Sequence, residues 1–258
     1  MNYFKVLLKF VIPYKYHSKV KYSFFRLRSL LYIGTKVTCP CCSSHFRKFL
    51  SYRRSRLNAI CPRCGAAERQ RLLWLYLKNK TNIFNNNLKV LHFAPEYNLQ
   101  KNFRSMENLD YTSADLYSSV SMVKMDITNI LYKENSFDVI LVSHVLEHVI
   151  DDRKAMRELF RVLKPGGWAI IQSPIDLKRD QTYEDFTVTL PEDRERVFGN
   201  PGHVRIYGRD YKNRLEEAGF NVKLDPYVKE FSDDEVIKYG LDKSEDIYFC
   251  IKQETNYV

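Results

Sequence analysis

Four cysteines arranged as two pairs constrain this chain more than any other feature. Cys39-Pro-Cys-Cys42 and Cys61-Pro-Arg-Cys64 are both C-x2-C turns, and 18 residues separate the two pairs. Two such turns can aim four thiolates at one ion and form the closed tetrahedral shell of a structural zinc. We therefore predict a zinc site made by Cys39, Cys42, Cys61 and Cys64, with Cys41 and His45 as alternative ligands beside the first pair. Clustered cysteines also suit a reducing compartment, so we expect a cytoplasmic protein.

Charge is distributed unevenly along the chain. Residues 1–80 carry 18 Lys and Arg against one acid, Glu68, whereas the remainder carries 23 against 30 acids. Such a basic segment favours an anionic partner, either RNA or a membrane surface to which the protein would be peripheral, although a solvated basic face explains the same charges. We expect no transmembrane segment, because no run of about 18 uncharged apolar residues is present. Phe4–Ile12 is apolar but interrupted by lysines and followed by Pro13, so we expect no signal peptide there.

The chain divides into three zones by composition. Residues 1–36 form a basic, aromatic segment, which packs as an extra helix or binds an anionic membrane. Residues 37–80 hold the cysteines and a leucine-rich helix at 66–80, and residues 87–258 alternate strand and helix signals. This alternation predicts an α/β domain whose mostly parallel sheet has helices on both faces. The expected strands are 88–93, 109–114, 122–125, 137–143, 168–172, 220–224 and 247–251, and the expected helices are 98–106, 152–163 and 211–218.

Glycine usage limits the ligand that this sheet can bind. None of the nine glycines lies between Gly65 and Gly166, so the first half of the sheet has neither G-x-G-x-x-G nor a P-loop. Those loops bring backbone N–H groups against phosphates, so their absence argues against NAD, FAD and ATP. It argues less strongly against S-adenosylmethionine, which carries no phosphate.

The motifs from residue 88 onward follow one order. An apolar strand at 88–93 is followed by Asp115, then Asp126-Ile127, then FDVILVSHVLEHV at 137–149 and LKPGG at 163–167. Residues 87–252 resemble the class I S-adenosylmethionine-dependent methyltransferases of the type 11-like group. The whole chain is similar to an uncharacterised bacterial family with an N-terminal CxxC...CxxC module. The resemblance implies a Rossmann-like sheet, S-adenosylmethionine as cofactor, and methyl transfer by direct displacement to an unidentified oxygen or nitrogen acceptor.

The resemblance also implies cofactor contacts. Asp115 would bind the ribose hydroxyls, Asp126 and Ile127 would line the adenine, and Ser143 would border the transferred methyl together with His144. The full predicted cofactor set is His92, Ala94, Pro95, Glu96, Asp115, Leu116, Asp126, Ile127, Ser143 and His144.

The first loop departs from the family pattern of an acid followed by G-x-G. It reads His92, Ala94, Glu96 and Asn98 at those positions. We predict that Glu96 takes over the contact to the ammonium group of the ligand. The alternative is that this loop has lost the cofactor and that the protein is a non-catalytic binding module.

A general base assists proton removal from an oxygen or nitrogen acceptor, and histidine is the side chain that titrates nearest to neutral pH. We predict His144 or His203 for this role. His203 lies in the polar and aromatic segment 174–207, where the superfamily often places a substrate lid, although an ordinary solvated loop is the simpler interpretation. The predicted acceptor-binding residues are Tyr183, Glu184, Asp185, Arg205 and Tyr207.

Two further interpretations compete with this one. His144-Val-Leu-Glu147-His148 fits the H-x-x-E-H pattern of a group of metalloproteases, but its place between a buried strand and LKPGG favours a methyltransferase. A four-cysteine module before a class I domain also resembles the zinc-containing ribosomal-RNA guanine methyltransferases. An enzyme that methylates rRNA or tRNA is therefore an alternative, although no N-P-P-Y-type tetrad is present.

Overall fold

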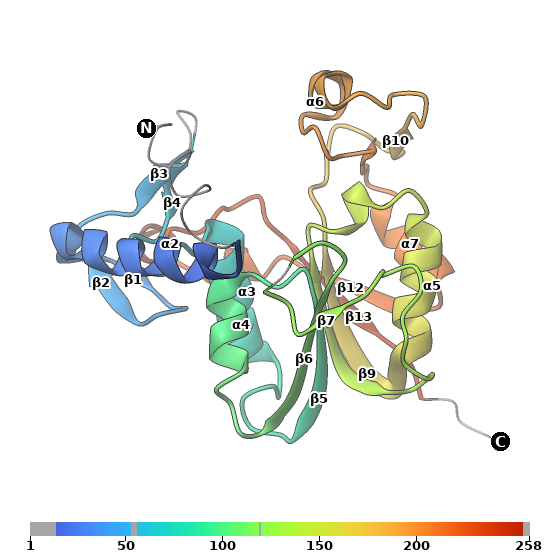
Figure 1. Ribbon diagram of the computed structural model, residues 1–258, viewed down its shortest axis with the longest axis horizontal. Coiled ribbons are helices and arrows are strands. Elements are labelled where there is room, and N and C mark those ends of the chain that lie inside the picture. The colour runs from blue at the N-terminus through green and yellow to red at the C-terminus, as the bar shows by residue number, and fades with distance from the viewer. Residues whose placement is uncertain (1–13, 53–55, 119, 255–258) are drawn as a thin grey trace. The chain divides into compact units, whose positions relative to one another are not determined.

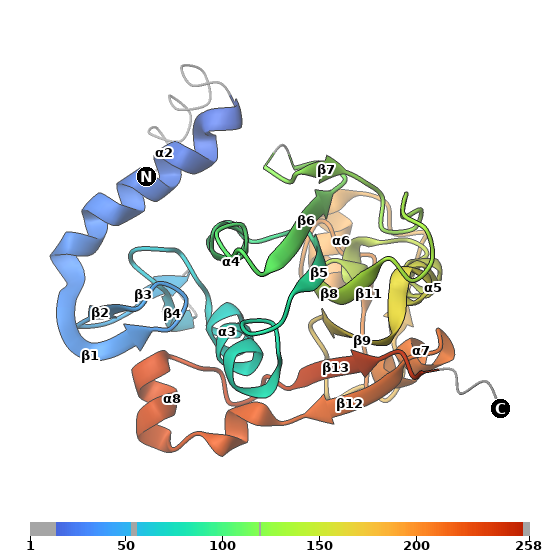
Figure 2. The ribbon, with the colours of Figure 1, turned by 90° about the horizontal axis from the view of Figure 1, so that it is seen from below.

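The computed structural model describes residues 14–52, 56–118 and 120–254. The apolar stretch Phe4–Ile12, which we expect not to be a signal peptide, lies outside the described residues. The chain forms two compact units (Figures 1 and 2). The first contains residues up to Asn86 together with Glu96–Asn108 and Pro226–Asp246, and the second contains Asn87–Pro95, Leu109–Asp225 and the residues from Ile247. The continuous domain predicted for 87–258 is thus interrupted by two segments that belong to the first unit.

The second unit is built on a seven-stranded sheet with the strand order β12-β13-β9-β8-β5-β6-β7. The strands from β9 to β7 are parallel, and β13 runs antiparallel to both β9 and β12. This arrangement confirms the predicted class, a mostly parallel Rossmann-like sheet that a four-cysteine module precedes in the sequence. The strands are β5 (Leu88–Phe93), β6 (Leu109–Asp115), β7 (Val123–Lys124), β8 (Phe137–Ser143), β9 (Leu163–Gln172), β12 (Asn221–Asp225) and β13 (Ile247–Ile251).

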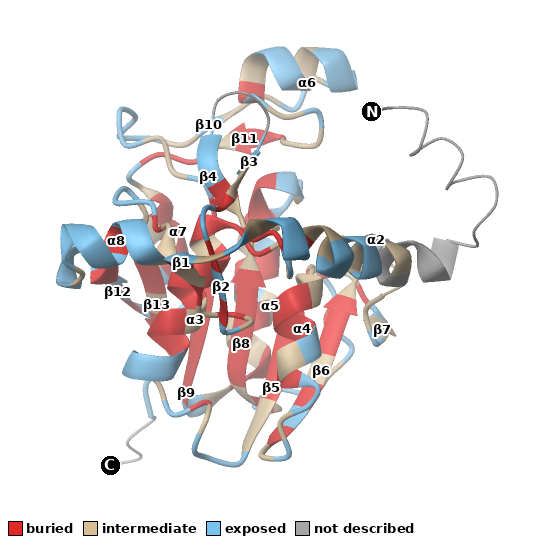
Figure 3. Cartoon of the chain, turned by 90° about the vertical axis from the view of Figure 1, so that its left-hand side faces the viewer, coloured by how far each residue is buried: buried red, intermediate tan, exposed pale blue. Residues whose placement is uncertain are grey.

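Apolar composition explains why the central strands form. β8 reads FDVILVS, and five of its residues are buried because a parallel strand is covered on both faces (Figure 3). Helix α5 (Asp152–Val162) begins where the Asp151 carboxylate accepts a hydrogen bond from the Lys154 amide, at 2.9 Å. Its apolar side chains join the same core as α7 (Tyr211–Glu217): Ala155, Met156, Leu159 and Val162.

The LKPGG motif corrects one boundary. It was expected to stop a helix before a strand at 168–172, but β9 already begins at Leu163. The pairing of β8 with β9 jumps from Phe137↔Leu163 to Val139↔Trp168, so the intervening residues form a bulge. Gly167 is required there, because a Cβ would lie 2.8 Å from the Asp138 carbonyl oxygen.

The strand order creates a switch point at the centre of the sheet. β5 pairs with β6 on one side and with β8 on the other, so the chain winds outward in both directions from β5. Ligands of open α/β sheets bind outside the carboxyl ends of the strands at such a point. A further hairpin follows the sheet's fifth strand: β10 (Tyr183–Glu184) pairs with β11 (Arg205–Ile206), and α6 (Pro191–Phe198) lies between them in sequence.

The first unit holds two small hairpins and several helices. β1 (Ile33–Cys39) pairs with β2 (Ser44–Phe46), and β3 (Leu50–Tyr52) pairs with β4 (Arg56–Ile60). The helical elements are α2 (Tyr14–Ser29), η1 (Leu30–Tyr32), α3 (Glu68–Lys80), α4 (Tyr97–Phe103), η3 (Tyr227–Glu230) and α8 (Asp233–Tyr239). Within the described residues, no helix is both long enough and apolar enough to cross a membrane.

Arg71 joins three parts of the first unit that lie far apart in sequence. Its side chain is fully buried and donates hydrogen bonds to four backbone carbonyls. Two of these belong to Ala59 and Ala66 near the cysteines, and two belong to Tyr239 and Gly240 at the C-terminal end of α8. Arg71 therefore lies in the core of this unit.

Candidate functional site

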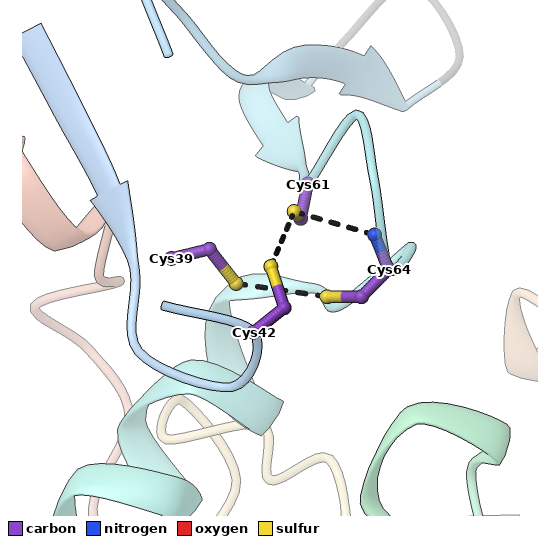
Figure 4. Close-up of side chains that lie close together, drawn as sticks. All are labelled: Cys39, Cys42, Cys61 and Cys64. Atoms are coloured by element: carbon purple, nitrogen blue, oxygen red, sulfur yellow. Dashed lines mark hydrogen bonds between the residues drawn. The ribbon is translucent and has the colours of Figure 1, made fainter. Parts of the chain in front are cut away.

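The four predicted zinc ligands come together in the first unit (Figure 4). The Sγ atoms of Cys39 and Cys64 are 3.6 Å apart, and those of Cys42 and Cys61 are 3.8 Å apart. Four sulfurs around one zinc ion at about 2.3 Å lie about 3.8 Å from each other, so the cluster has the size of a zinc shell. The distances are far longer than the S–S bond of a disulfide, about 2.05 Å.

The alternative ligands are occupied elsewhere. The Cys41 thiol donates to the carbonyl of Gln70 at 3.5 Å, and the His45 ring contacts the Thr38 hydroxyl at 3.0 Å. The geometry therefore selects the regular C-x2-C pairing at both turns.

Hydrogen bonds among the four thiols shift their pKa values in opposite directions. Hydrogen bonds from its three neighbours lower the pKa of Cys42, and hydrogen bonding to Cys39 and Cys42 raises the pKa of Cys61. One thiolate therefore forms readily, while the next is opposed by the negative charge already present. A divalent cation would reverse this balance, because bound thiols are deprotonated.

A separate cavity of about 580 Å³ lies in the second unit, at the carboxyl ends of the central strands. Its lining comes from the ends of β5 and β6, from the loop after β7 and from the segment after β8. This is the switch-point location described above. The lining residues are Phe93, Ala94, Asp115, Leu116, Tyr117, Met125, Asp126, Ile127, Thr128, His144, Val145, His148, Val149, Ile150, Asp151 and Lys154.

Six predicted cofactor residues line this cavity, and two of them are carboxylates held by their own loops. The Oδ1 atom of Asp115 accepts the amides of Tyr117 at 2.7 Å and Ser118 at 2.6 Å. The Oδ1 atom of Asp126 accepts both the amide and the hydroxyl of Thr128, at 2.8 and 2.9 Å. Each carboxylate is thus fixed through one oxygen and keeps its Oδ2 atom for a ligand.

Two residues of the cavity wall have a left-handed backbone. Ala94 has φ 45° and His144 has φ 57°, a region that non-glycine residues rarely adopt. Hydrogen bonds hold both in place: the Ala94 amide donates to Ala114 and the His144 amide donates to Gln172. Such strained residues cluster where proteins bind ligands. The loop after β5 has therefore kept a glycine-type conformation without a glycine.

His144 belongs to a short chain of buried polar groups. Its Nδ1 atom lies 3.2 Å from Oε1 of Glu147, and the Ser173 hydroxyl donates to Oε2 of Glu147 at 3.1 Å. Burial raises the pKa of the Glu147 carboxyl, but the hydrogen bond and charge of His144 outweigh it and bring the pKa below its usual value. The Nε2 atom of His144 is buried and has no hydrogen-bond partner among the described residues.

Four predicted cofactor residues do not line the cavity. His92 is fully buried in the sheet, where its Nδ1 atom contacts the Tyr111 hydroxyl at 2.9 Å. Glu96 belongs to the first unit, and its Oε1 atom accepts a hydrogen bond from the Gln70 side chain at 3.1 Å. Pro95 and Ser143 are also absent from the lining. The proposed contact of Glu96 to a ligand ammonium stays a hypothesis, and its carboxylate already has this internal partner.

The predicted acceptor residues separate into two groups. Arg205 and Tyr207 are fully buried, so their assignment to acceptor binding is corrected: both hold the fold. Arg205 donates to Glu184 at 2.7 Å and to the carbonyls of Leu146, Val149 and Ile150, and the Tyr207 hydroxyl donates to Asp152 at 2.7 Å. Arg205 cannot reach an acceptor because its donors are committed to the backbone that follows β8.

The other group is accessible but shows no convergence on the cavity. Tyr183 is exposed and lies beneath the Arg179 guanidinium, and the half-buried Asp185 accepts hydrogen bonds from the amide and hydroxyl of Thr187. Glu184 pairs with Arg214 at 2.6 Å in addition to Arg205. None of these three residues lines the cavity at the strand ends.

His203, the second candidate base, lies beside His148. Their ring centroids are 4.7 Å apart, and burial lowers the pKa of His203 below its usual value. His148 lines the cavity but His203 does not. No sequence pattern pairs these two histidines, because the loop that carries His203 has no periodicity.

A second cavity, of about 430 Å³, lies within the first unit beside the thiolates. Its lining includes the basic residues Arg26, Arg63 and Lys101, and also Cys42 and Cys64 of the thiolate cluster. The rings of Tyr22 and Tyr97 stack in its wall with centroids 3.8 Å apart. Three positively charged side chains thus border this concave surface.

Comparison with known proteins identifies the central part of the second unit. Residues 89–171 match the family described as "Methyltransferase domain". The chain is 31% identical over 118 residues to the ubiquinone/menaquinone biosynthesis C-methyltransferase UbiE of Idiomarina loihiensis, covering 41% of this chain and 47% of that protein. It is 34% identical over 86 residues to the demethylmenaquinone methyltransferase of Paenarthrobacter aurescens, covering 32% of this chain and 34% of that protein. The chain thus spans half or less of the length of these curated relatives.

A similar fold also occurs among solved structures. An S-adenosylmethionine-dependent methyltransferase from Mesorhizobium loti aligns with 69% of this chain and 97% of its own, at 14% identity and a TM-score of 0.47. The match to the methyltransferase domain covers β5 to most of β9, which includes every strand that borders the cavity of about 580 Å³. This agreement confirms the resemblance on which the cofactor predictions depend.

Proposed function

Taking residues 89–171 as a class I methyltransferase domain, we propose that the cavity at the strand ends binds S-adenosylmethionine and that the protein methylates an acceptor. The observation that carries this proposal is the lining of the cavity. Ala94, Asp115, Asp126, Ile127 and His144 lie around one space, in the part of the chain that matches the domain. When bound, S-adenosylmethionine would supply a methyl group, which would pass to an acceptor lone pair as the bond to the sulfonium sulfur breaks and S-adenosylhomocysteine leaves.

The residues of the cavity support this chemistry mainly by positioning. The free Oδ2 atom of Asp115 is suited to accept hydrogen bonds from a pair of ribose hydroxyls, because Oδ1 is already fixed by the backbone. Ile127 offers an apolar surface to a purine ring, and Asp126 offers an acceptor at its edge. Alignment of donor and acceptor accounts for much of the acceleration of a displacement reaction.

His144 is suited to remove a proton from an oxygen or nitrogen acceptor. The Glu147 carboxylate orients Nδ1, which leaves Nε2 as the nitrogen available for proton transfer. A screen of methyl acceptors would identify the substrate. By name, the two curated relatives above are quinone-pathway methyltransferases and one is a C-methyltransferase, so the screen should include carbon acceptors as well as oxygen and nitrogen acceptors.

The test is calorimetric titration of S-adenosylmethionine and S-adenosylhomocysteine into the purified protein. Micromolar binding is expected in the wild type. Asp115→Asn should weaken it by about 10- to 100-fold, the value of a hydrogen bond to a charged group. Asp110→Asn serves as the matched control, since Asp110 is an exposed acid on the same strand and should bind normally. Absence of binding in the wild type would favour the non-catalytic module.

The thiolate cluster is proposed to hold one structural zinc ion. Its four sulfurs fill a tetrahedral shell and leave no open position for a substrate. Cys61→Ser should lose the metal and destabilise the first unit, whereas Cys41→Ser should retain it because Cys41 bonds to Gln70 instead. Zinc content by elemental analysis separates the two outcomes, and equal zinc in both variants would exclude this ligand set.

The basic cavity in the first unit favours an anionic partner, and we propose a single-stranded RNA. Arginine and lysine around stacked tyrosine rings suit a phosphate backbone with its bases. Fluorescence anisotropy with a labelled RNA should show affinity that falls as salt rises, and Arg63→Ala should reduce the slope by about one unit. Arg104→Ala, an exposed arginine outside the cavity, is the control. A salt-independent affinity, or none, would leave a solvated basic face.

A further inference from the structure

Three side chains of the second unit form a group that neither the thiolate cluster nor the cofactor contacts explain. The carboxylate of Glu147 and ring nitrogens of His148 and His203 all lie within 4.8 Å of one another. Two imidazoles and one carboxylate are the ligand set of a catalytic zinc site, which leaves a fourth position open. We infer that Glu147, His148 and His203 bind a second divalent metal ion of the zinc class at the rim of the methyl-transfer cavity.

The hydrogen bonds of His148 prepare it for this role. Its Nδ1 atom lies 2.9 Å from the carbonyl oxygen of Gly202, which can only accept, so Nδ1 carries the proton. Nε2 therefore keeps its lone pair. Metal-binding histidines are usually oriented in this way, with the second nitrogen donating to a carbonyl or a carboxylate.

Glu147 is equally prepared. Glu147 is only 1% exposed, and its two carboxylate oxygens face the His144 imidazole and the Ser173 hydroxyl. A carboxylate offers about four lone-pair positions, so these contacts leave room for a metal. They also fix the orientation of the ligand, and a buried carboxylate beside imidazoles is stabilised by a cation.

The backbone holds the third ligand in register with the first two. The Val204 amide donates to the carbonyl of Glu147 at 2.9 Å, and Arg205 binds the carbonyls of Leu146 and Ile150. His203 is thereby attached to the segment that carries Glu147 and His148. Ligands around one zinc ion lie about 3.4 Å apart, so rotation of the exposed His148 and the half-buried His203 by a small amount completes the site.

The location indicates what the open position would bind. His148 lines the cavity in which the methyl donor is proposed to lie, as does His144. A metal-bound hydroxyl loses its proton far more readily than a free one, so an acceptor with a hydroxyl that can bind the metal is favoured. This identification of the acceptor class rests on the proposed methyl transfer, whereas the metal site itself does not.

The experiment titrates Zn²⁺ into full-length protein that already holds one equivalent, with calorimetry and elemental analysis after dialysis. The wild type should bind a second equivalent. His148→Gln and His203→Gln should each weaken that equivalent by at least about 100-fold while keeping the first. His45→Gln, which removes an exposed imidazole from the first unit, should bind two equivalents like the wild type.

A variant that removes no ligand tests the geometry. A Cβ on Gly202 would lie 2.9 Å from Nδ1 of His148, so Gly202→Ala should displace the ring and weaken the second equivalent by about 10- to 100-fold. A thermal unfolding curve for each variant shows whether it is folded. If one histidine variant does not fold, the other still tests the site. A wild type that binds one equivalent, or a second equivalent that persists in both histidine variants, overturns the inference. S-adenosylmethionine titrated into the same samples reports separately on the proposed function.

Discussion

Replacing Arg71 with lysine should destabilise the first unit strongly although it preserves the charge. The Arg71 guanidinium donates to four carbonyls from three atoms: Nε to Tyr239 at 2.7 Å, Nη1 to Ala59 and Ala66 at 2.9 and 2.6 Å, and Nη2 to Gly240 at 2.6 Å. A lysine ammonium carries three donors on one atom and cannot span this arrangement. We expect it to leave about two buried carbonyls without a partner.

The magnitude follows from these contacts. Two unpaired carbonyls cost about 1–3 kcal/mol each, and the guanidinium also loses its position 4.1 Å from the centre of the Phe49 ring, worth about 0.5–2 kcal/mol. The middle of the summed range is about 5 kcal/mol. Taking a urea dependence of about 2 kcal/mol per molar, the unfolding midpoint of this unit should fall by about 2.5 M.

Tryptophan fluorescence can follow this unit alone. The chain has two tryptophans, Trp74 in α3 of the first unit and Trp168 in β9 of the second. In a Trp168→Phe background, the signal of Trp74 reports the unfolding of the first unit. Arg104→Lys, an exposed change, should stay within about 0.5 kcal/mol of that background. A midpoint for Arg71→Lys within about 0.5 M of the background would refute the role of the four carbonyls.

Three other changes test the packing more briefly. Arg205→Met should cost about 3–5 kcal/mol in urea unfolding because it leaves buried acids and carbonyls unpaired, whereas Arg209→Ala, from an exposed ion pair, should cost about 0–1 kcal/mol. Burial raises the pKa of Glu184, but hydrogen bonds and charge from Arg205 and Arg214 outweigh it and hold the pKa below 4.5. The ionised carboxylate therefore stabilises the fold above that pH, and this contribution is lost as the pH falls through the folded pKa. Glu184→Gln should flatten the acid limb of a plot of unfolding free energy against pH, and an unchanged limb would contradict this role. Gly240→Ala should lower the melting temperature by several degrees, since φ is 58° and the new Cβ would lie 2.6 Å from the Phe49 ring, and a melting temperature equal to that of the wild type would count against the clash.

The features that could be predicted from the sequence are those whose signal is local. The spacing of the two cysteine pairs is enough to bring their thiols together. Asp115 and Asp126 lie at the carboxyl ends of parallel strands, where the geometry of such a sheet places ligand-binding residues. β13, predicted at 247–251, occupies those residues in the structure because its apolar run has clear ends.

The errors came from burial and from long-range contacts, which periodicity does not report. Arg205 and Tyr207 occur in a polar, aromatic segment that reads as a surface loop, yet both side chains are fully buried. His92 was aligned with a cofactor-binding acid but packs inside the sheet against Tyr111. The proximity of His148 and His203 depends on the carbonyls that Arg205 binds, and no neighbouring residue signals it.

The path of the chain through the first unit has a consequence for how the protein is made. Arg71 bonds to the carbonyl of Gly240, which is 169 residues later in the sequence. During synthesis, the thiolate turns and α3 leave the ribosome long before the segment that completes their core. The strands from β5 to β12 are synthesised after α3 and before Gly240, so the sheet can begin to fold before the first unit is complete. Early zinc binding by the nascent thiolates would stabilise the incomplete unit during this interval. The alternative is a chaperone that covers Phe49, which stays exposed until the segment that buries it has been synthesised.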